Sequence, residues 1–485
     1  MVSVKFDQQV ENGLRESGLA HPMKMEDGIL DDDGRHKRTG TVWTAFAHIV
    51  TACIGAGVLS LAWAMSQLGW LAGICILLIF SSISLLTANL LADSYRSPDP
   101  ITGKRNYSYM EAVESILGGT MYLFCGWILY GTLATCAVGY TITTAKSLVA
   151  IQKSNCNRKN GGNAACKFSI YPHILGFGVV EIMLSQIPNF HKLTWLSTIA
   201  AIMSFGYTSI GIALSILKIA NGDRGKASVV GAEVGASDKV WRMFAATGDI
   251  AFACTYVQVL MDIQDTLKSS EAESENKVMK KASMLGVSTM TTLFMMCGCL
   301  GYAAFGDHAP ENLLTGFAYN REVFWVTDLA NLFIVVHLVG AYQLFSQPVF
   351  RVVELWASRK WPESGFINTN HQISIFGNKI RFNVNFFKVS WRTSFVAAAS
   401  VIAMALPFFT DMLALLGAVE YWPIVVYFPV EMHIKQYKIG KATKKWIGFQ
   451  LLSVMCLLVS FASAAGAIQG LLKGLHSFQP FKTKD

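Results

Sequence analysis

Charged residues are scarce in this 485-residue chain, and their scarcity excludes most classes of soluble protein. Asp, Glu, Lys and Arg make up 15% of the residues, whereas 52% are hydrophobic. A soluble chain of this length is expected to carry about 25% charged residues. The mean hydropathy of +0.39 points the same way. The composition predicts an integral membrane protein, and the net charge of +8 indicates loops that face anionic lipid of the bilayer, with no nucleic-acid partner.

Targeting and catalytic motifs are also missing. The first 40 residues hold no apolar run behind a basic start, so no cleaved secretory signal is expected. Neither His-Glu-x-x-His nor Gly-x-Ser-x-Gly occurs in the chain. We therefore expect no enzyme activity, no metal and no other cofactor.

Long apolar stretches recur along the whole chain. Each is near or above the roughly 20 residues that a helix needs to cross the hydrocarbon core. The stretches are 42–65, 70–92, 121–150, 170–187, 194–219, 242–264, 282–303, 324–347, 389–409, 411–432 and 446–472. They predict an all-α membrane protein with eleven transmembrane helices.

The loop charges predict the orientation of these spans. Lys and Arg gather in alternate loops, for example in the collar 35–38 and in the loop 433–445. The positive-inside rule places such loops in the cytoplasm. We therefore expect a cytoplasmic tail over 1–40, a transmembrane domain over 41–472 and an extracellular tail over 473–485.

An eleven-span chain can be divided into five, five and one. Because five is odd, the second set of five enters the membrane from the opposite side, which gives an inverted repeat. Span six (242–264) is then the mate of span one, and we expect it to be broken near its middle. Small and polar residues do gather there, over 247–256.

Span one carries the most informative local pattern, Ile54-Gly55-Ala56-Gly57-Val58-Leu59-Ser60. Each glycine costs a membrane helix about 1 kcal/mol relative to alanine. Gly55 and Gly57 stand too close together to form a small-xxx-small helix contact. The pattern has two interpretations: a broken helix whose freed backbone groups meet a substrate, or a kink that allows tight packing.

Ionisable residues inside spans are candidate proton carriers. His48 lies in span one and His337 near the centre of span eight, while Glu181 lies deep in span four. Histidine changes its charge near neutral pH, which suits a proton pathway. The alternative for either histidine is a neutral ring satisfied by a backbone carbonyl. Asp249, Asp262 and Asp328, in spans six and eight, are further candidates. Asp249 and Asp328 lie near span ends, where we expect solvated placement at the interface rather than a proton relay.

Cys156 and Cys166 bracket the polar loop 155–167, which the predicted topology places outside the cell. A disulfide can persist in that compartment. The sequence therefore indicates a bridge between them, the alternative being two unpaired thiols.

Several motifs resemble the plant amino acid permeases of the amino acid/auxin permease family. They are Ile54-Gly55-Ala56-Gly57-Val58-Leu59-Ser60 with its flanks, Gly298-Cys299-Leu300-Gly301-Tyr302-Ala303-Ala304-Phe305-Gly306, and the segments 38–41, 47–51, 92–100, 103–107 and 186–193. The resemblance runs from about residue 35 to the C-terminus. It implies a leucine-transporter-like fold and proton-coupled uptake of free amino acids across the plasma membrane of a plant cell.

The resemblance also implies a binding site at the two breaks. Amides around Ala56 would bind the substrate carboxylate, carbonyls of span six would bind the ammonium, and Phe252 and Tyr256 would cover the side chain. The implied residues are Ile54, Gly55, Ala56, Gly57, Val58, Ala251, Phe252, Ala253, Cys254 and Tyr256. We further expect Gly57→Val to abolish uptake without loss of surface expression.

The coupling ion and the substrate class stay open to some degree. Sodium-driven relatives use hydroxyls of span eight, but residues 328–345 contain no Ser or Thr, which favours protons. An amino acid sensor with little transport is one alternative. A proton-coupled carrier of auxin or another organic acid is the other.

Overall fold

The computed structural model describes residues 31, 37–159, 166, 168–187, 194–268, 273–317, 324–375, 380–406 and 408–477. The chain divides into two compact units, Met1–Thr39 and Gly40–Asp485. In the first, Arg38 forms an ion pair with Asp31 at 3.0 Å. Most of the predicted tail 1–40, part of the loop 155–167, most of the motif 186–193, and residues 478–485 lie outside the described residues.

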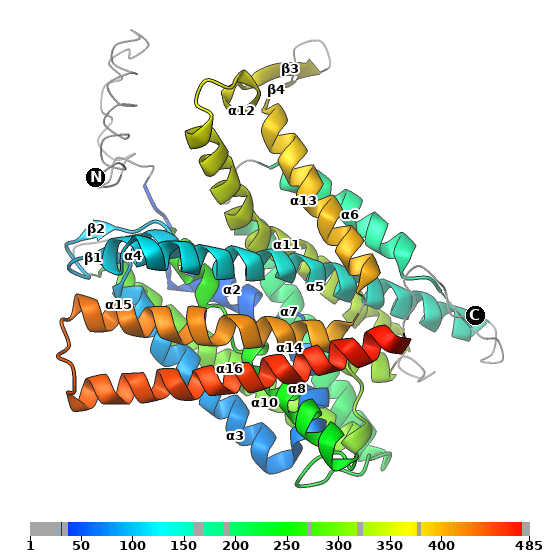
Figure 1. The fold of residues 1–485 in the computed structure, drawn as a ribbon. Coiled ribbons are helices and arrows are strands. Elements are labelled where there is room, and N and C mark those ends of the chain that lie inside the picture. Colours follow the sequence, from blue (N-terminus) through cyan, green and yellow to red (C-terminus); the bar gives the residue numbers. More distant parts are fainter. Residues whose placement is uncertain are drawn as a thin grey trace. The chain divides into compact units, whose positions relative to one another are not determined.

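The second unit consists almost wholly of helices (Figure 1). Its α-helices are α2 (Val42–Cys53), α3 (Gly57–Asp93), α4 (Tyr109–Ile116), α5 (Gly119–Lys159), α6 (Tyr171–Ser185), α7 (Thr194–Ala220), α8 (Ala236–Ala253), α9 (Leu260–Gln264), α10 (Glu275–Phe305), α11 (Phe324–Lys360), α12 (Gly365–Asn368), α13 (Phe386–Ala405), α14 (Phe409–Glu420), α15 (Phe428–Gln436) and α16 (Lys444–Ser477). Two short hairpins pair β1 (Arg96–Ser97) with β2 (Lys104–Arg105) and β3 (His371–Ile375) with β4 (Ile380–Val384). The prediction of an all-helical membrane protein is confirmed.

Eight of the described helices are long and apolar enough to cross a membrane. One of them, α3, holds more than one predicted span, because Gly69 interrupts it with φ 78° and ψ 177°. A β-carbon at Gly69 would overlap the backbone of Val229 and Gly231, so only glycine fits this turn. At the other end of the chain, α16 continues to Ser477, past the predicted boundary at residue 472.

Two spans are broken in their middle, as the sequence predicted. The first runs through α2, leaves the helix at Ile54 and resumes at Gly57. The second runs through α8, leaves the helix at Cys254, and resumes through a 3-10 turn, η2 (Val257–Val259), and α9. Helices α3 and α8 pack against each other, which brings the two breaks together.

A third irregular stretch has no counterpart in the sequence prediction. Between α14 and α15 the chain forms a π-helix, η5 (Tyr421–Tyr427), which contains Pro423. Proline lacks an amide hydrogen and disturbs the regular ladder. The Tyr109 hydroxyl donates to the carbonyl of Ile424 at 2.6 Å, so a carbonyl of this stretch gains a partner from α4.

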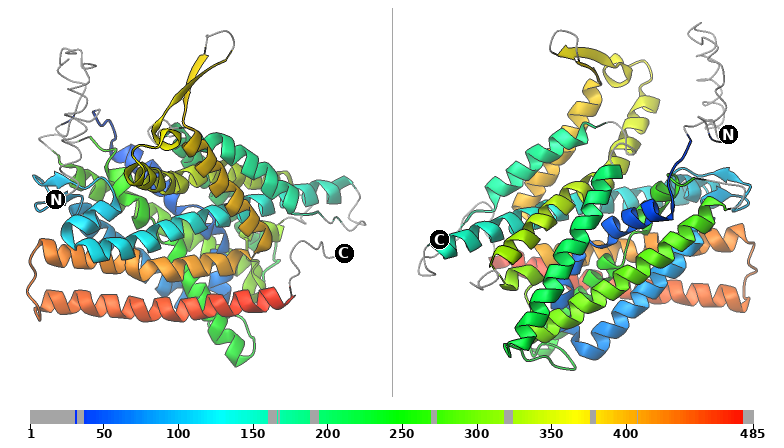
Figure 2. Two further views of the ribbon diagram at one scale, coloured as in Figure 1. Left: turned by 45° about the horizontal axis from the view of Figure 1, so that its top comes forward. Right: turned by 180° about the vertical axis from the view of Figure 1, so that it is seen from behind.

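Small residues bring several helices into close backbone contact, the usual means of helix association in lipid. A β-carbon at Gly248 of α8 would lie 2.5 Å from the carbonyl oxygen of Ala414 on α14. A β-carbon at Gly466 of α16 would lie about as close to the backbone of Trp241 and of Ala245 on α8. Figures 1 and 2 show α14 and α15 in line as one orange rod, with α16 beside it as the orange-to-red rod.

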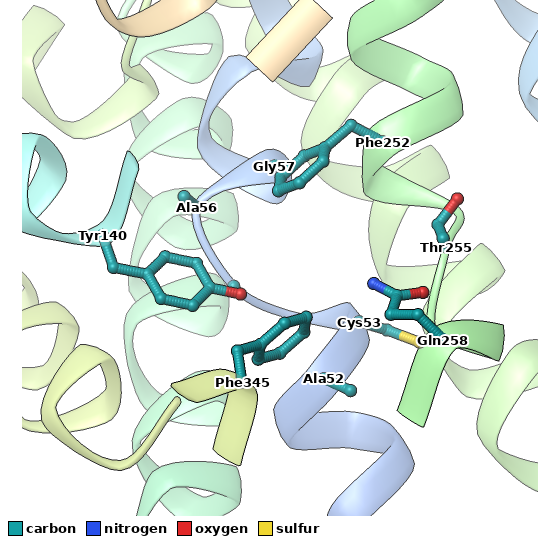
Figure 3. A pocket seen from close by; sticks show the side chains of 10 residues that line it. Ala52, Cys53, Ala56, Gly57, Tyr140, Phe252, Thr255, Gln258 and Phe345 are labelled. Carbon is teal, nitrogen blue, oxygen red and sulfur yellow. The ribbon is translucent and has the colours of Figure 1, made fainter. Parts of the chain in front are cut away.

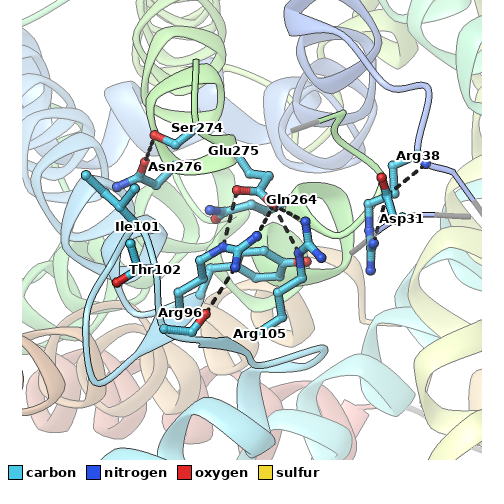
Figure 4. A network of polar contacts seen from close by, with 12 residues as sticks. Asp31, Arg38, Arg96, Ile101, Thr102, Arg105, Gln264, Ser274, Glu275 and Asn276 are labelled. Atoms are coloured by element: carbon cyan, nitrogen blue, oxygen red, sulfur yellow. Dashed lines mark hydrogen bonds and ion pairs between the residues drawn. The ribbon is translucent and has the colours of Figure 1, made fainter. Parts of the chain in front are cut away.

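A buried ionic cluster ties the β1–β2 hairpin to the start of α10 (Figure 4). The Arg96 guanidinium donates to the Glu275 carboxylate at 2.7 Å and that of Arg105 donates to it at 2.6 Å. The Glu275 side chain is only 2% exposed. The Glu275 carboxylate therefore bridges two buried guanidinium groups.

We predict that Glu275→Ala destabilises the protein strongly, because it leaves Arg96 and Arg105 buried without their shared anion. Removing one partner from a buried ion pair costs about 3–5 kcal/mol. Thermal unfolding of the purified protein in detergent measures the change. The control is Glu273→Ala, which removes an exposed partner of Lys281 and should cost less than about 1 kcal/mol. Equal shifts for both variants would contradict this account of the cluster.

Candidate functional site

A small cavity lies where the two broken spans meet (Figure 3). Its lining comes from the end of α2 and the break that follows, from α5, from the end of α8 and the turn after it, and from α11. The lining residues are Ala52, Cys53, Gly55, Ala56, Gly57, Tyr140, Phe252, Thr255, Gln258 and Phe345. The cavity volume of about 10 Å³ is about what one water molecule needs.

The start of α3 presents amide donors beside this cavity. Among the described residues the amides of Gly57 and Val58 have no partner, whereas that of Leu59 donates to the carbonyl of Ala56 at 3.2 Å. The amide of Ile54 still donates to the carbonyl of Val50 at 2.8 Å, so α2 ends in the ordinary way. Helix α3 then begins at Gly57, with no side-chain cap from Ala56. The first amides of a helix have no intrahelical partner, and the helix dipole makes that end attractive to anions.

The carbonyls freed by the break are held by α7. The Tyr207 hydroxyl donates to the carbonyl of Ile54 at 2.7 Å and to that of Gly55 at 3.1 Å. The Ser204 hydroxyl also donates to Ile54, at 2.9 Å. These contacts satisfy buried acceptors that the broken ladder would otherwise leave unpaired. Neither Tyr207 nor Ser204 was singled out from the sequence. The available signal was a pair of polar side chains three residues apart in an apolar span.

His337 of α11 joins the same cluster. Its Nδ1 lies 2.8 Å from the Ser204 hydroxyl oxygen and 3.0 Å from the carbonyl oxygen of Ala200. Because a carbonyl only accepts, the network assigns the proton to Nδ1. The other nitrogen, Nε2, has no partner among the described residues. A β-carbon on Gly55 would lie 3.6 Å from it, so Nε2 faces the break.

The end of α8 supplies backbone carbonyl acceptors, but only some of the expected carbonyls are available to a ligand. The carbonyl of Ala251 accepts from the Thr255 hydroxyl at 2.8 Å, and that of Phe252 accepts from the Thr255 amide at 3.1 Å. The carbonyls of Ala253 and Cys254 accept no hydrogen bond from the part of the chain that the structure describes. The carbonyl oxygens that are available to a ligand are therefore those of Ala253 and Cys254.

Only one of the two aromatic residues that we expected to cover the substrate side chain lines the cavity. Phe252 lines the cavity, whereas Tyr256 is fully buried and is not among the lining residues. Tyr140 and Phe345 take its place, with ring centroids 5.5 Å apart in an edge-to-face pair. Sequence reasoning missed both, because the convergence of α5 and α11 on the break depends on how the helices pack.

The other predicted residues lie around the cavity or further away. Ile54, Val58, Ala251, Ala253 and Cys254 belong to the two breaks without lining the cavity.

His48 is buried in α2. Glu181 accepts a hydrogen bond from the Gln343 amide at 2.7 Å, and Gln343 stands six residues after His337 on α11. Helix α11 therefore carries both His337 and the hydrogen-bond partner of Glu181. Cys156 and Cys166 are joined by a disulfide, with their Cα atoms 6.0 Å apart.

Two expectations need correction. Asp249 is not solvated but fully buried, because α8 begins at Ala236 and not at residue 242. Gly57 also serves close packing, since a β-carbon there would lie 3.0 Å from Ala253. Gly57→Val would therefore disturb the packed core, and the expected loss of uptake at normal surface expression is not a clean test of binding.

Two broken helices that face each other across a membrane-embedded cavity are the architecture of a secondary transporter. The fold is similar to that of MhsT in complex with L-phenylalanine, with a TM-score of 0.56 and 11% identity over 89% of this chain and all of that one. The family described as "Transmembrane amino acid transporter protein" matches residues 38–473. The chain belongs to this family.

The relatives of this chain include the amino acid permeases of Arabidopsis thaliana. It is 52% identical to amino acid permease 1 over 96% of both chains. It is 46% identical to probable amino acid permease 7 over 90% of this chain and 94% of that one. The expected resemblance to plant amino acid permeases is confirmed.

We predict that Tyr207→Phe raises the KM for substrate roughly tenfold at normal surface expression. The variant leaves a buried carbonyl of the break without its donor, at a cost of about 1–3 kcal/mol, and the break then no longer presents its amides in one geometry. The control is Tyr256→Phe, because the Tyr256 hydroxyl has no partner among the described residues. Transport per surface molecule measures both. An unchanged KM in Tyr207→Phe would show that the hydroxyl does not support the site.

Proposed function

We propose that this protein is a proton-coupled symporter that imports amino acids across the plasma membrane of a plant cell. The observation that carries the proposal is the pairing of opposite polarities at the two facing breaks, beside the cavity. Unused amides at the start of α3 suit a carboxylate, and the open carbonyls of Ala253 and Cys254 suit an ammonium group. An amino acid carries both groups a single carbon apart. The names of the Arabidopsis relatives support the same substrate class.

Substrate entry requires the cavity walls to move. A volume of about 10 Å³ admits one water molecule and no amino acid. The side chains that can open it are Phe252, Phe345 and Gln258, which come from different elements. Binding therefore goes with a rearrangement of these side chains, which is the local part of a change between closed and open states.

Among His48, Glu181 and His337, the residue that we prefer for a role in proton coupling is His337. A second proton on the ring would go to Nε2, the nitrogen that faces Gly55. The resulting positive charge beside the break would favour a bound carboxylate. His48 and Glu181 stay as further candidates, and the proton serves as coupling ion with no other cofactor.

The topology that we propose has eleven spans, arranged as two inverted repeats of five plus one. Helix α2 and the part of α3 before Gly69 form span one, and the rest of α3 forms span two. The shorter apolar helix α6 and the 20-residue α13 complete the count beside the other long helices. In this arrangement the N-terminus is cytoplasmic and the C-terminus extracellular.

The alternatives fit the site less well. Auxin or another organic acid without an ammonium group would leave the carbonyls of Ala253 and Cys254 unpaired in a buried site, which is costly. A sensor with little transport could use the same site. Measured turnover separates a sensor from a symporter.

We predict inward currents when amino acids are added to cells that express the chain, larger at acidic than at neutral external pH. Uptake should survive the replacement of sodium and collapse with a protonophore, because the hydroxyl-free stretch 328–345 lacks the sodium ligands of sodium-driven relatives. The same recording with auxin and other organic acids tests the runner-up substrates. Sodium-dependent uptake that tolerates the protonophore would overturn proton coupling.

A further inference from the structure

Asp249 is a buried carboxyl group that the site described above does not use. It lies on α8, four residues before the helix ends at Ala253, and its side chain is 0% exposed. Neither carboxyl oxygen has a hydrogen-bond partner among the described residues. An ionised carboxylate without a partner is costly in such a place, which makes this group a candidate for reversible protonation.

Asp249 stands four residues before Ala253 on α8, and a β-carbon at Gly57, the first residue of α3, would lie 3.0 Å from Ala253. Residues four apart share one face of a helix, so Asp249 lies on the side of α8 that packs on the start of α3. Its polar neighbour there is the Ser60 hydroxyl, which donates to the carbonyl of Gly57 at 2.9 Å. Asp249 is thus separated from the first turn of α3 by one side chain. A negative charge on Asp249 would repel a carboxylate bound at that turn, and a proton on Asp249 would remove the repulsion.

Two other acidic residues, Glu311 and Asp411, act on Asp249 through their charge. The Glu311 side chain is 54% exposed and pairs with Lys146 at 3.7 Å, and Asp411 on α14 is half-buried. Exposure therefore falls stepwise from Glu311 through Asp411 to Asp249. Lys146 is the cation in this set, and it pairs with the outermost acid, Glu311. Asp249 itself has no ion-pair partner among the described residues.

We propose that Asp249 binds the coupled proton on the extracellular side and that its protonation is required for tight binding of the substrate carboxylate. The inference rests on the proposed symport function and deepens it. The proton passes from external water to the Asp249 carboxylate before or with the substrate, and returns to water when the site opens to the cytoplasm. Substrate affinity then rises as external pH falls, because the protonated form is the binding-competent one.

The test is Asp249→Asn, which keeps the shape of the side chain and is neutral at every pH. We expect the wild type to lose affinity by on the order of tenfold from acidic to neutral external pH, a typical size for coupling between two sites. The variant should show the high affinity at both values. In proteoliposomes it should exchange internal for external amino acid, yet lose the proton influx that accompanies substrate and the accumulation driven by a pH gradient.

Two comparison variants sharpen the result. Asp238→Asn changes an acid at the start of the same helix that is 48% exposed and pairs with Lys473, and it should behave as the wild type. Glu420→Gln changes another fully buried carboxyl without a partner among the described residues, and it should keep the pH dependence of KM. Loss of that dependence in Glu420→Gln but not in Asp249→Asn would overturn the assignment.

The outcomes separate the inference from the function on which it rests. A wild type without substrate-linked proton influx overturns the proposed symport. A coupled wild type together with Asp249→Asn of unchanged pH dependence overturns only the role of Asp249. If Asp249→Asn does not fold, Ser60→Ala serves instead. It removes the neighbouring hydroxyl and should shift the pH midpoint of KM, and an unchanged midpoint would contradict the proposal.

Discussion

Backbone groups inside a membrane need partners, and this requirement shapes the centre of the molecule. In hydrocarbon no water replaces a lost helical hydrogen bond. The break between α2 and α3 therefore exists only because Tyr207 and Ser204 of α7 supply donors to the carbonyls of Ile54 and Gly55. With the acceptors satisfied in this way, the amides of the break are the groups left for a ligand. One set of helix contacts thus creates the polarity of the site.

The second broken span complements the first. The hydroxyl and amide of Thr255 occupy the carbonyls of Ala251 and Phe252, which leaves those of Ala253 and Cys254 open. Close packing of α8 on α3 at Gly57 brings these donors and acceptors together beside one small cavity. The histidine of α11 and the acid of α8 do not line that cavity, but each stands near one of the two breaks. Ionisation of either group would act on a carboxylate bound there through charge and would need no direct contact.

The sequence predicted the parts of this arrangement that follow from local pattern and span count. Gly55 and Gly57 pointed to the first break because two glycines one residue apart weaken a membrane helix. The second break followed from symmetry, and small residues around Cys254 agreed with it. What the pattern could not give was the rotation of helices about their axes. Tyr140 and Phe345 reach the cavity, and Tyr256 misses it, for that reason.

Two further differences between prediction and structure arise because hydropathy does not report where a helix starts or how its backbone is wound. Asp249 was expected near a span end because hydropathy starts the span at residue 242, but α8 begins six residues earlier with charged and polar residues. The π-helical stretch Tyr421–Tyr427 left no sign in the hydropathy pattern, because its residues are as apolar as those of a regular helix. Gly57 shows that the two interpretations of the glycine pattern were not exclusive, since it allows both close packing and an open helix start.

The central claim is that the amides at the start of α3 bind the substrate carboxylate. The most direct measurement is the binding of an amino acid and of its decarboxylated amine to the purified protein by calorimetry at acidic pH. The amine keeps the side chain and the ammonium group and lacks only the carboxylate. The account predicts that the amino acid binds and that the amine binds at least about 100-fold more weakly, a loss of roughly 3 kcal/mol. Equal affinities would contradict the account.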